Sequence, residues 1–334
     1  MTRSNRTLIV LFLRLIILAV MLSAGNSLSA QEAKAASAET GGSAEAQTLY
    51  EKGRDAWSNH DLSGAADMFQ QAVQKDPKFA AAWVALGGTH YELHHVDQAV
   101  EDWKKAATLD PTSVTEGTLI LITLSRSGHT DDAIAIWQIA EKGEPNDPDV
   151  HDGLGNLLSG AKRYPEAIAE YEKTMQFKPN DPALLEALGA AELQNGEQEK
   201  GVADLEKSVV LDGSGFRHML VAHEFVDHNI RLDEALQYAQ FAVSEVESTT
   251  AKLSLDTVKI YDFRGILDLA NAWEVLGWVQ FRLGHYDQAA IYENAAVKLN
   301  PADGEGFAHL GQAYEKQGKK LEAMIAYTRS LATR

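Results

Sequence analysis

Three of the chain's histidines are spaced so that they could bind a metal ion. The sequence of 334 residues contains 11 histidines. His90 and His94 lie four residues apart, with His95 next to them. On a helix this spacing places two imidazole rings on one face, as a zinc site requires. The His90/His94/His95 cluster is therefore either a metal site or a group with a packing and turn role, and the choice depends on the elements that carry it.

The other motifs with catalytic potential are incomplete. His223 and His228 are five residues apart, whereas the zinc protease motif needs two histidines four apart on one helix face. The glycine-containing segment at residues 212–215 lacks the Gly-Lys-Ser/Thr that holds a phosphate, and no Gly-x-Ser-x-Gly elbow occurs. With no cysteine, the chain has no thiolate ligand and no cysteine nucleophile. We therefore expect no enzymatic activity, no catalytic residue, no metal and no cofactor.

Composition places the chain among folded proteins and excludes one class of partner. The hydrophobic fraction of 45% and the charged fraction of 23% are ordinary for globular proteins, so wholesale disorder is excluded. The formal net charge is −18. This excess of acid argues against a nucleic-acid partner, because proteins that bind nucleic acid neutralise phosphates with lysine and arginine.

Residues 1–30 have the layout of a secretory signal peptide. Arg3 and Arg6 precede an apolar stretch at residues 8–22, which contains Arg14, and small and polar residues follow. An uncleaved membrane anchor formed by residues 8–22 is the alternative, although this stretch is shorter than the roughly 20 residues that span a bilayer. Cleavage would change the net charge from −18 to −21, since it removes three arginines and no acid. We expect an exported protein of the bacterial periplasm or cell envelope, with residues 31–45 as a flexible tether.

A repeat of 34 residues organises the rest of the chain. Prolines recur with this step at positions 77, 111, 145 and 179, and alanines recur at 65, 99, 133 and 167. The second period has the most complete pattern, with Trp83, Leu86, Gly87, Tyr91, Ala99, Trp103, Ala106 and Pro111. From about residue 46 to residue 334, the chain resembles the tetratricopeptide repeat (TPR) family. The resemblance implies an all-α fold, an α-solenoid formed as a right-handed superhelix of about eight TPR helix-turn-helix units.

The phase of the repeat sets the expected boundaries. Units 1–6 occupy residues 46–249 and units 7 and 8 occupy residues 270–334, with an insertion at 250–269. Apolar spacing predicts a long helix over about residues 262–283, preceded by a loop around residues 253–260. In the second unit, His90 stands where the family carries a packing aromatic, and His94 and His95 lie at the turn between the two helices. This placement favours packing over metal binding for the three histidines.

The C-terminal units have a narrower resemblance. Residues 273–278 (WEVLGW) and 310–318 (LGQAYEKQG) are similar to TPR regions of bacterial envelope proteins associated with transglutaminase-like domains. The sequence shows no such domain. The resemblance therefore implies a location and a role as an accessory module of an envelope enzyme or assembly complex, not an activity.

The last predicted helix, at about residues 321–333, presents an apolar face without a successor to cover it. Its apolar residues are Leu321, Met324, Ile325 and Leu331. Solenoids usually end in a polar capping helix. We therefore expect self-association at this end, a docked partner, or a natural chain that continues further.

In TPR proteins, certain places on the first helix of each unit line a groove that binds partners. Carried over place by place, the resemblance implies a partner-binding groove formed by Tyr50, Arg54, Trp57, Tyr91, Arg126, Asp149, Asp152, Asn156, Glu224, Asp227, Asn271, Glu274, Trp278, Phe281 and Arg282. Exposed Trp, Tyr and Arg often supply most of the binding energy of an interface, although aromatics at such places also serve packing. The acidic middle of this groove predicts a protein or peptide partner that is neutral to cationic. We expect an exported, non-catalytic scaffold or adaptor.

Overall fold

The computed structural model describes residues 42–115, 124, 125, 127–250 and 262–333. In these ranges the regular structure is helical, without strands, which confirms the predicted all-α class. The predicted signal peptide, the alternative anchor and most of the predicted tether lie outside the described residues. The chain divides into two compact units between Pro179 and Asn180. We describe each unit by itself.

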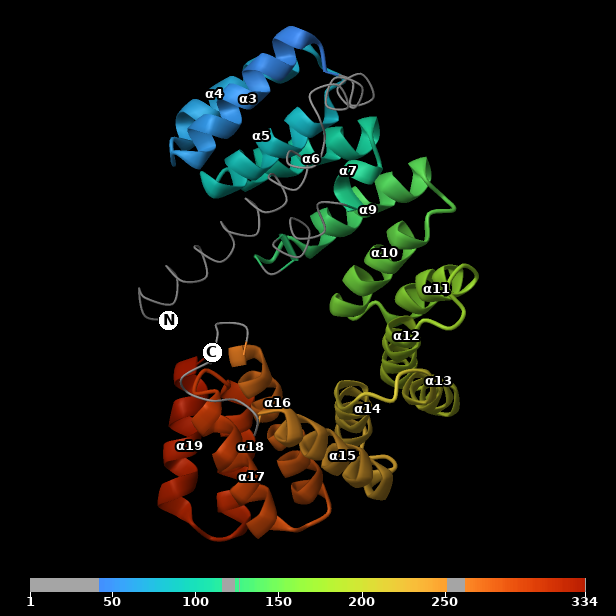
Figure 1. Cartoon of the computed structure of the whole chain (residues 1–334), viewed down its shortest axis with the longest axis vertical. Coiled ribbons are helices and arrows are strands. Elements are labelled where there is room, and N and C mark those ends of the chain that lie inside the picture. Colours follow the sequence, from blue (N-terminus) through green and yellow to red (C-terminus); the bar gives the residue numbers. More distant parts are fainter. Residues whose placement is uncertain (1–41, 116–123, 126, 251–261, 334) are drawn as a thin grey trace. The chain divides into compact units, whose positions relative to one another are not determined.

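The N-terminal unit is a series of antiparallel helix pairs (Figure 1). Its helices are α3 (Ala44–Ser58), α4 (Leu62–Lys75), α5 (Ala80–Glu92), α6 (Val96–Leu109), α7 (Thr112–Thr115), α9 (Thr130–Gly143), α10 (Pro148–Gly160) and α11 (Tyr164–Met175). Each pair packs against the next, so that α4 contacts α5, α6 contacts α9 and α9 contacts α10. This is the stacking that the repeat predicts, because a single pair cannot bury its own apolar faces.

The C-terminal unit continues the same pattern of paired helices. Its helices are α12 (Pro182–Gln194), α13 (Gln198–Leu211), α14 (Gly215–Asp227), α15 (Leu232–Thr250), α16 (Asp262–Arg282), α17 (Tyr286–Leu299), α18 (Gly304–Lys316) and α19 (Lys320–Thr333). We call the first helix of each pair helix A and the second helix B. In several repeats helix A begins at a side-chain cap: Asp181 and Asp303 each accept two backbone N–H bonds of the first turn.

The turn from helix A to helix B places one residue in the left-handed backbone region. His60, His94 and Lys162 have φ angles of 64°, 65° and 61°. In other repeats the same place holds a glycine, at Gly128, Gly196, Gly284 and Gly318. Glycine adopts this conformation without a steric penalty, whereas other residues pay about 1–2 kcal/mol. His94 is therefore a turn residue, as the sequence predicted.

Helices A and B cross closely where helix A carries glycine and helix B carries a large ring. A Cβ atom on Gly53 would lie 2.6 Å from the Phe69 ring, and a Cβ atom on Gly87 would lie 2.6 Å from the Trp103 ring. The pairs Gly155 with Tyr171 and Gly311 with Tyr327 repeat this geometry. In the seventh repeat, however, the residue opposite Gly277 is Glu293, an acid in place of the ring.

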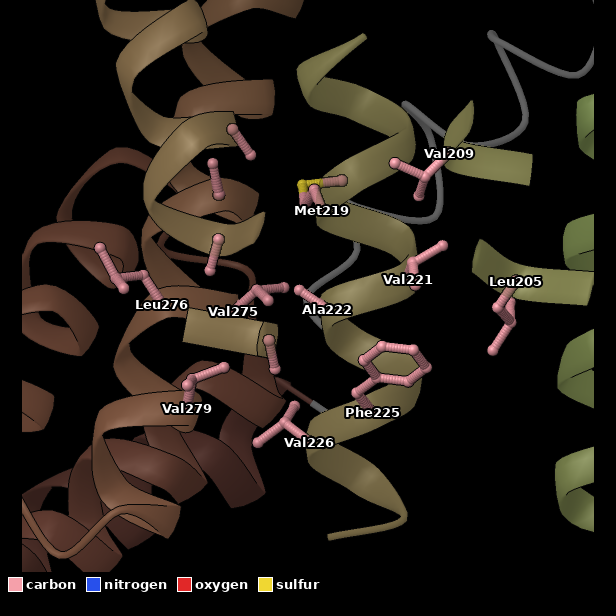
Figure 2. Close-up of a cluster of buried hydrophobic side chains, with 14 of the residues drawn as sticks. Leu205, Val209, Met219, Val221, Ala222, Phe225, Val226, Val275, Leu276 and Val279 are labelled. Carbon is pink, nitrogen blue, oxygen red and sulfur yellow. The ribbon is translucent and has the colours of Figure 1, made fainter. Parts of the chain in front are cut away.

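A large hydrophobic cluster of the C-terminal unit surrounds α14. Figure 2 shows Phe225 and Val221 on the side of this helix that faces Leu205 of α13, and Ala222 and Val226 on the side that faces α16. The buried α16 residues in this cluster are Ala272, Val275, Leu276 and Val279. Burying an aliphatic or aromatic side chain contributes about 1.5–3 kcal/mol, so this layer fixes the position of α16.

Two helices of the C-terminal unit are longer than their counterparts. The long helix predicted over residues 262–283 is present as α16, of 21 residues, while the predicted loop at 253–260 lies outside the described residues. α15 has 19 residues, against 14 in α13 and α17, and the sequence did not predict this extension. The Trp273 indole N–H of α16 donates to Glu247 Oε1 in the added turn, at 3.2 Å. The extension is thus stabilised by a contact with α16.

Candidate partner-binding surface

The predicted groove residues of α3 contribute mainly to packing. The Tyr50 ring lies 5.6 Å from the Phe69 ring and 5.2 Å from the Phe79 ring. Burial raises the pKa of the Tyr50 hydroxyl. The Arg54 guanidinium lies 6.0 Å above the Tyr50 ring. Trp57 is only 6% exposed and belongs to a buried hydrophobic cluster of α3, α4 and α5. The role of Trp57 is therefore packing, which was the alternative to partner binding for these aromatics.

The other predicted residues of the N-terminal unit are spread over two helices. Tyr91 of α5 is half-buried, and its ring lies 6.0 Å from the Trp103 ring. On α10, the exposed Asp149 accepts a 2.6 Å bond from Lys178 Nζ, and Asn156 Oδ1 accepts one of 2.9 Å from the Tyr171 hydroxyl. Asp152 is half-buried on the same helix. Arg126 lies outside the described residues.

The three histidines of the second repeat do not converge on one point. His90 Nδ1 lies 2.6 Å from Asp102 Oδ2 of α6, a contact that joins helix A to helix B. Burial raises the pKa of the Asp102 carboxyl, and the hydrogen bond from His90 opposes this shift. His94 occupies the left-handed turn and His95 immediately precedes α6. Each histidine thus has a place in the packing or the turn of its own repeat.

In the C-terminal unit, the predicted aromatics form one stack. The Trp278 ring lies flat on the His309 ring of α18, with centroids 4.0 Å apart and planes 4° apart. Phe281 stacks on Trp278 at 4.9 Å, and the Arg282 guanidinium lies 5.6 Å above the indole. The Trp278 N–H donates to Asp227 Oδ1 of α14 at 3.1 Å. Trp278 therefore links three successive A helices, and it remains half-exposed.

Acidic side chains border this stack. Asp227 is exposed at the end of α14, and the half-buried Glu224 lies one turn earlier on the same helix. Burial raises the pKa of Glu224, while His223 and His228 oppose the shift. Glu186 of α12 accepts a 2.9 Å bond from Arg217, and burial raises its pKa as well. Asn271 is exposed near the middle of α16.

Glu274, another predicted groove residue, points to a pair of residues that the sequence analysis missed. Its Oε1 atom lies 2.8 Å from Nδ1 of His309, which is buried in α18. The same nitrogen lies 3.7 Å from Oε1 of Glu293, which is fully buried in α17. The phase of the repeat could have identified Glu293, because five other repeats hold an aromatic residue at its place: Phe69, Trp103, Trp137, Tyr171 and Tyr327.

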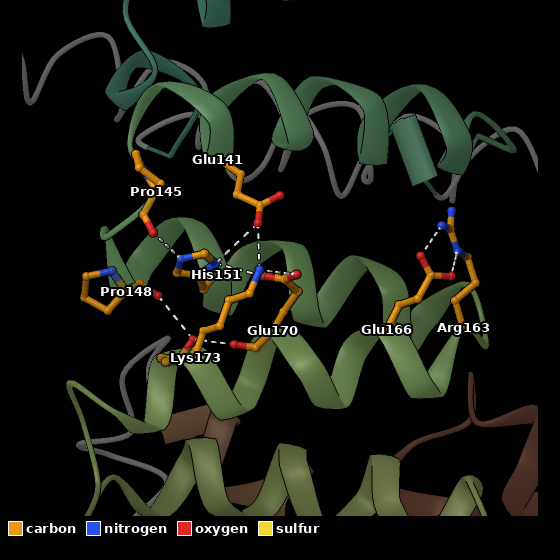
Figure 3. A network of polar contacts seen from close by, with 9 residues as sticks. Glu141, Pro145, Pro148, His151, Arg163, Glu166, Glu170 and Lys173 are labelled. Atoms are coloured by element: carbon orange, nitrogen blue, oxygen red, sulfur yellow. Dashed lines mark hydrogen bonds and ion pairs between the residues drawn. The ribbon is translucent and has the colours of Figure 1, made fainter.

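The N-terminal unit holds a second buried polar cluster of similar composition (Figure 3). His151 Nδ1 lies 2.7 Å from Glu170 Oε2, and its other ring nitrogen lies 3.0 Å from the Pro145 carbonyl oxygen. Lys173 donates to Glu141 at 2.8 Å and to Glu170 at 2.9 Å. Here the chain itself provides a cation between the two carboxylates.

The repeat seen in the fold also appears in comparisons with known proteins. A family model described as tetratricopeptide repeat matches residues 50–114, 121–182 and 275–334, which together are more than half of the chain. The chain belongs to the tetratricopeptide repeat family. No curated protein sequence matches it.

Solved structures share the fold of this TPR protein at low sequence identity. A tetratricopeptide repeat protein from Parabacteroides merdae is 13% identical, with a TM-score of 0.56 over 87% of this chain and 94% of that one. Yeast Tom70 is 16% identical, with a TM-score of 0.53 over 87% of this chain and 61% of Tom70. A chain of the Cut9–Hcn1 hetero-tetramer is 14% identical, with a TM-score of 0.51 over 86% of this chain and 52% of that one. Among the described residues, none of the helices combines the length and hydropathy needed to cross a bilayer.

Proposed function

We propose that this TPR protein is a non-catalytic scaffold that binds a neutral to cationic protein or peptide on the C-terminal unit. The binding surface, which we call the Trp278 surface, consists of Asp227, Trp278, Phe281 and Arg282. One observation carries the proposal: the stacked aromatic rings of α16 are held in place by neighbouring helices yet are only half-buried. An aromatic side chain that is already ordered loses little entropy when a partner covers it.

The charges around the Trp278 surface define the chemistry of the partner. Asp227 and Glu224 border the rings on α14, and the chain as a whole carries a net charge of −18. An acidic border attracts cationic groups and raises the association rate of a basic peptide. A lysine or arginine of the partner would also lie favourably against the faces of Trp278 and Phe281.

Selection from a random peptide library tests the proposed class of ligand. The immobilised protein selects peptides, and the affinities of representative sequences are measured by fluorescence anisotropy at two salt concentrations. We expect enriched peptides that combine an aromatic or aliphatic residue with lysine or arginine and that bind more weakly at high salt. Enrichment of acidic peptides would contradict the proposal.

The location of the protein is a second part of the proposal. We propose that residues 1–30 direct export to the periplasm or cell envelope, with residues 8–22 as an inner-membrane anchor if they are not cleaved. The support lies in the sequence: the arginines at 3 and 6, the apolar stretch, and the small residues that follow. N-terminal sequencing of the protein from fractionated cells tests it. An intact N-terminus in the cytoplasmic fraction would contradict export.

We also propose that α19 offers a second contact surface. Leu321, Met324, Ile325 and Leu331 are 51–68% exposed along this helix. A contiguous apolar face of this kind usually marks an interaction site, and either a second copy or another partner can cover it. Sedimentation velocity of the protein and of its Ile325→Lys variant distinguishes these occupants. Concentration-dependent association that the variant lacks would identify a second copy.

A further inference from the structure

Glu293 occupies a place that holds an aromatic ring in five repeats and an apolar Leu205 or Ala239 in two others, so an acid there departs from the repeat. The side chain is fully buried against Gly277, whose added Cβ atom would lie 2.9 Å from Glu293 Cγ. Among the described residues, neither carboxylate oxygen has a hydrogen-bond partner. Burying an ionised carboxylate without a partner is strongly unfavourable. This carboxylate is therefore neutralised either by a proton, which leaves its oxygens without a hydrogen-bond partner, or by a cation that binds it directly.

The groups that face Glu293 are those of a cation site. His309 Nδ1 lies 2.8 Å from Glu274 Oε1 and 3.7 Å from Glu293 Oε1, and the three ligand atoms all lie within 4.8 Å of one another. Two ligand atoms on a tetrahedral zinc ion, each at about 2.0–2.2 Å from the metal, are about 3.4 Å apart. The 3.7 Å separation of His309 and Glu293 is close to this spacing, whereas the 2.8 Å separation of His309 and Glu274 is about 0.6 Å shorter, so a bound ion would move these two atoms apart.

We propose that Glu274, Glu293 and His309 bind a divalent transition-metal ion of the zinc class. An imidazole nitrogen with two carboxylate oxygens is a ligand set for zinc and its neighbours in the first transition row, whereas calcium and magnesium prefer oxygen ligands alone. The ion binds the imidazole at an Nδ1 that carries no proton, so a proton held between His309 and Glu274 moves to Nε2 of the same ring or to solvent. Asp303 and Glu305, near Glu293, add negative charge that favours the cation.

The three ligands come from three different helices, which gives the ion a structural role. Glu274 lies on α16, Glu293 on α17 and His309 on α18. A bound ion would therefore connect both helices of the seventh repeat to the first helix of the eighth. Because the His309 ring also supports Trp278 at 4.0 Å, the ion would fix the ring on which the Trp278 surface rests. The metal site itself does not depend on the proposed partner.

The similar cluster in the N-terminal unit already contains a cation, the ammonium group of Lys173. Glu141, His151 and Glu170 also bring their ligand atoms within 4.8 Å of one another. There Lys173 Nζ lies 2.8 Å from Glu141 and 2.9 Å from Glu170, so an ammonium group already compensates the carboxylates. A metal ion would have to displace that side chain. The inference therefore applies to the Glu293 cluster alone, and Glu170 supplies a matched control.

Zinc titration of the EDTA-treated full-length protein tests the proposal by isothermal calorimetry, with thermal unfolding as a second readout. We expect one zinc ion per chain with a Kd below about 1 µM and a higher Tm in its presence. Glu293→Gln, which keeps the side-chain size, should weaken zinc binding at least about a hundredfold. Glu170→Gln should bind zinc as the wild type does.

Two outcomes would overturn the proposal. The first is the absence of stoichiometric zinc binding by the wild-type protein, a result that does not depend on whether any variant folds. The other is a Glu293→Gln or Glu274→Gln variant with wild-type circular dichroism and unchanged zinc affinity, which would assign binding to other histidines. Cobalt substitution adds a spectroscopic check, because the visible absorption of a tetrahedral cobalt site should disappear in the same variants.

Discussion

The indole of Trp278 lies parallel to the imidazole of His309, with ring centroids 4.0 Å apart, although the two residues belong to different repeats. His309 in turn contacts the Glu274 carboxylate, and the Trp278 N–H is bonded to Asp227. The exposed aromatic surface of the C-terminal unit is therefore supported on two sides by polar contacts. A supported aromatic of this kind is suited to binding, because its geometry is set before a partner arrives.

The acidic border should govern the rate at which a basic partner associates. Replacing Asp227 by Asn keeps an acceptor for the Trp278 N–H and removes one negative charge. We expect a severalfold lower association rate for a basic peptide at low salt and little change in its dissociation rate. Stopped-flow fluorescence at several ionic strengths measures both rates. An association rate that is unaffected by the substitution would show that this border does not steer the partner.

Two adjacent glycines of α5 should respond to alanine in opposite ways. A Cβ atom on Gly87 would lie 2.6 Å from the Trp103 ring, so Gly87→Ala should lower the free energy of unfolding by about 1–3 kcal/mol. Gly88 has nothing within 4 Å of an added Cβ atom, so Gly88→Ala should raise it by about 0.5–1 kcal/mol. Urea denaturation followed by circular dichroism compares the two variants. Equal effects would contradict the close crossing of α5 and α6.

Lys162 lies in a left-handed turn, where a glycine should make the protein more stable. Its φ of 61° strains a side chain that glycine lacks, and Lys162→Gly should stabilise the protein by about 0.5–1 kcal/mol. Gly196, with φ of 85°, occupies the same place in the next repeat, and Gly196→Ala should destabilise the protein by about 1 kcal/mol or more. Thermal unfolding of both variants checks the pair. A loss of stability in Lys162→Gly would mean that the lysine side chain has a role of its own.

The half-buried carboxyl of Glu224 should make the stability of the C-terminal unit sensitive to pH. Burial raises its pKa above the ordinary value of 4.5, with Glu186 and Asp227 acting in the same direction and His223 and His228 opposing it. A carboxyl whose pKa is higher in the folded state adds stability below the unfolded pKa, and this contribution is lost as pH rises through the folded pKa. Glu224→Gln should therefore flatten the dependence of stability on pH above 4.5. Native-state hydrogen exchange in α14 measures this, and an unchanged profile would count against a raised pKa.

Most of the fold could be predicted because its determinants are local and recur in the sequence. The proline phase and the apolar anchors of each repeat located the helix pairs, and the apolar spacing after the insertion located α16. The extension of α15 could not be predicted in this way. Its added turn is polar, and it is held by the contact between Glu247 and Trp273, which are 26 residues apart.

The candidate site was less predictable, because exposure depends on which helix covers a residue. Trp57 and Trp278 were both predicted to bind a partner, yet Trp57 is buried beneath neighbouring side chains while Trp278 stays half-exposed. The acid at position 293 was visible as a departure from the repeat. Its contact with His309 was not, because that contact depends on the packing of three helices.

The central claim is that a partner binds on the Trp278 surface, and one paired measurement tests it most directly. Trp273 lies five residues earlier on α16, is also half-buried, and is bonded to Glu247 instead of Asp227. For a basic peptide selected by the wild type, anisotropy titrations of Trp278→Ala and Trp273→Ala give the two affinities. We predict that Trp278→Ala loses about 2 kcal/mol of binding free energy, roughly thirtyfold in Kd, while Trp273→Ala stays near wild type. Equal affinity of the folded Trp278→Ala variant and the wild type would contradict the account.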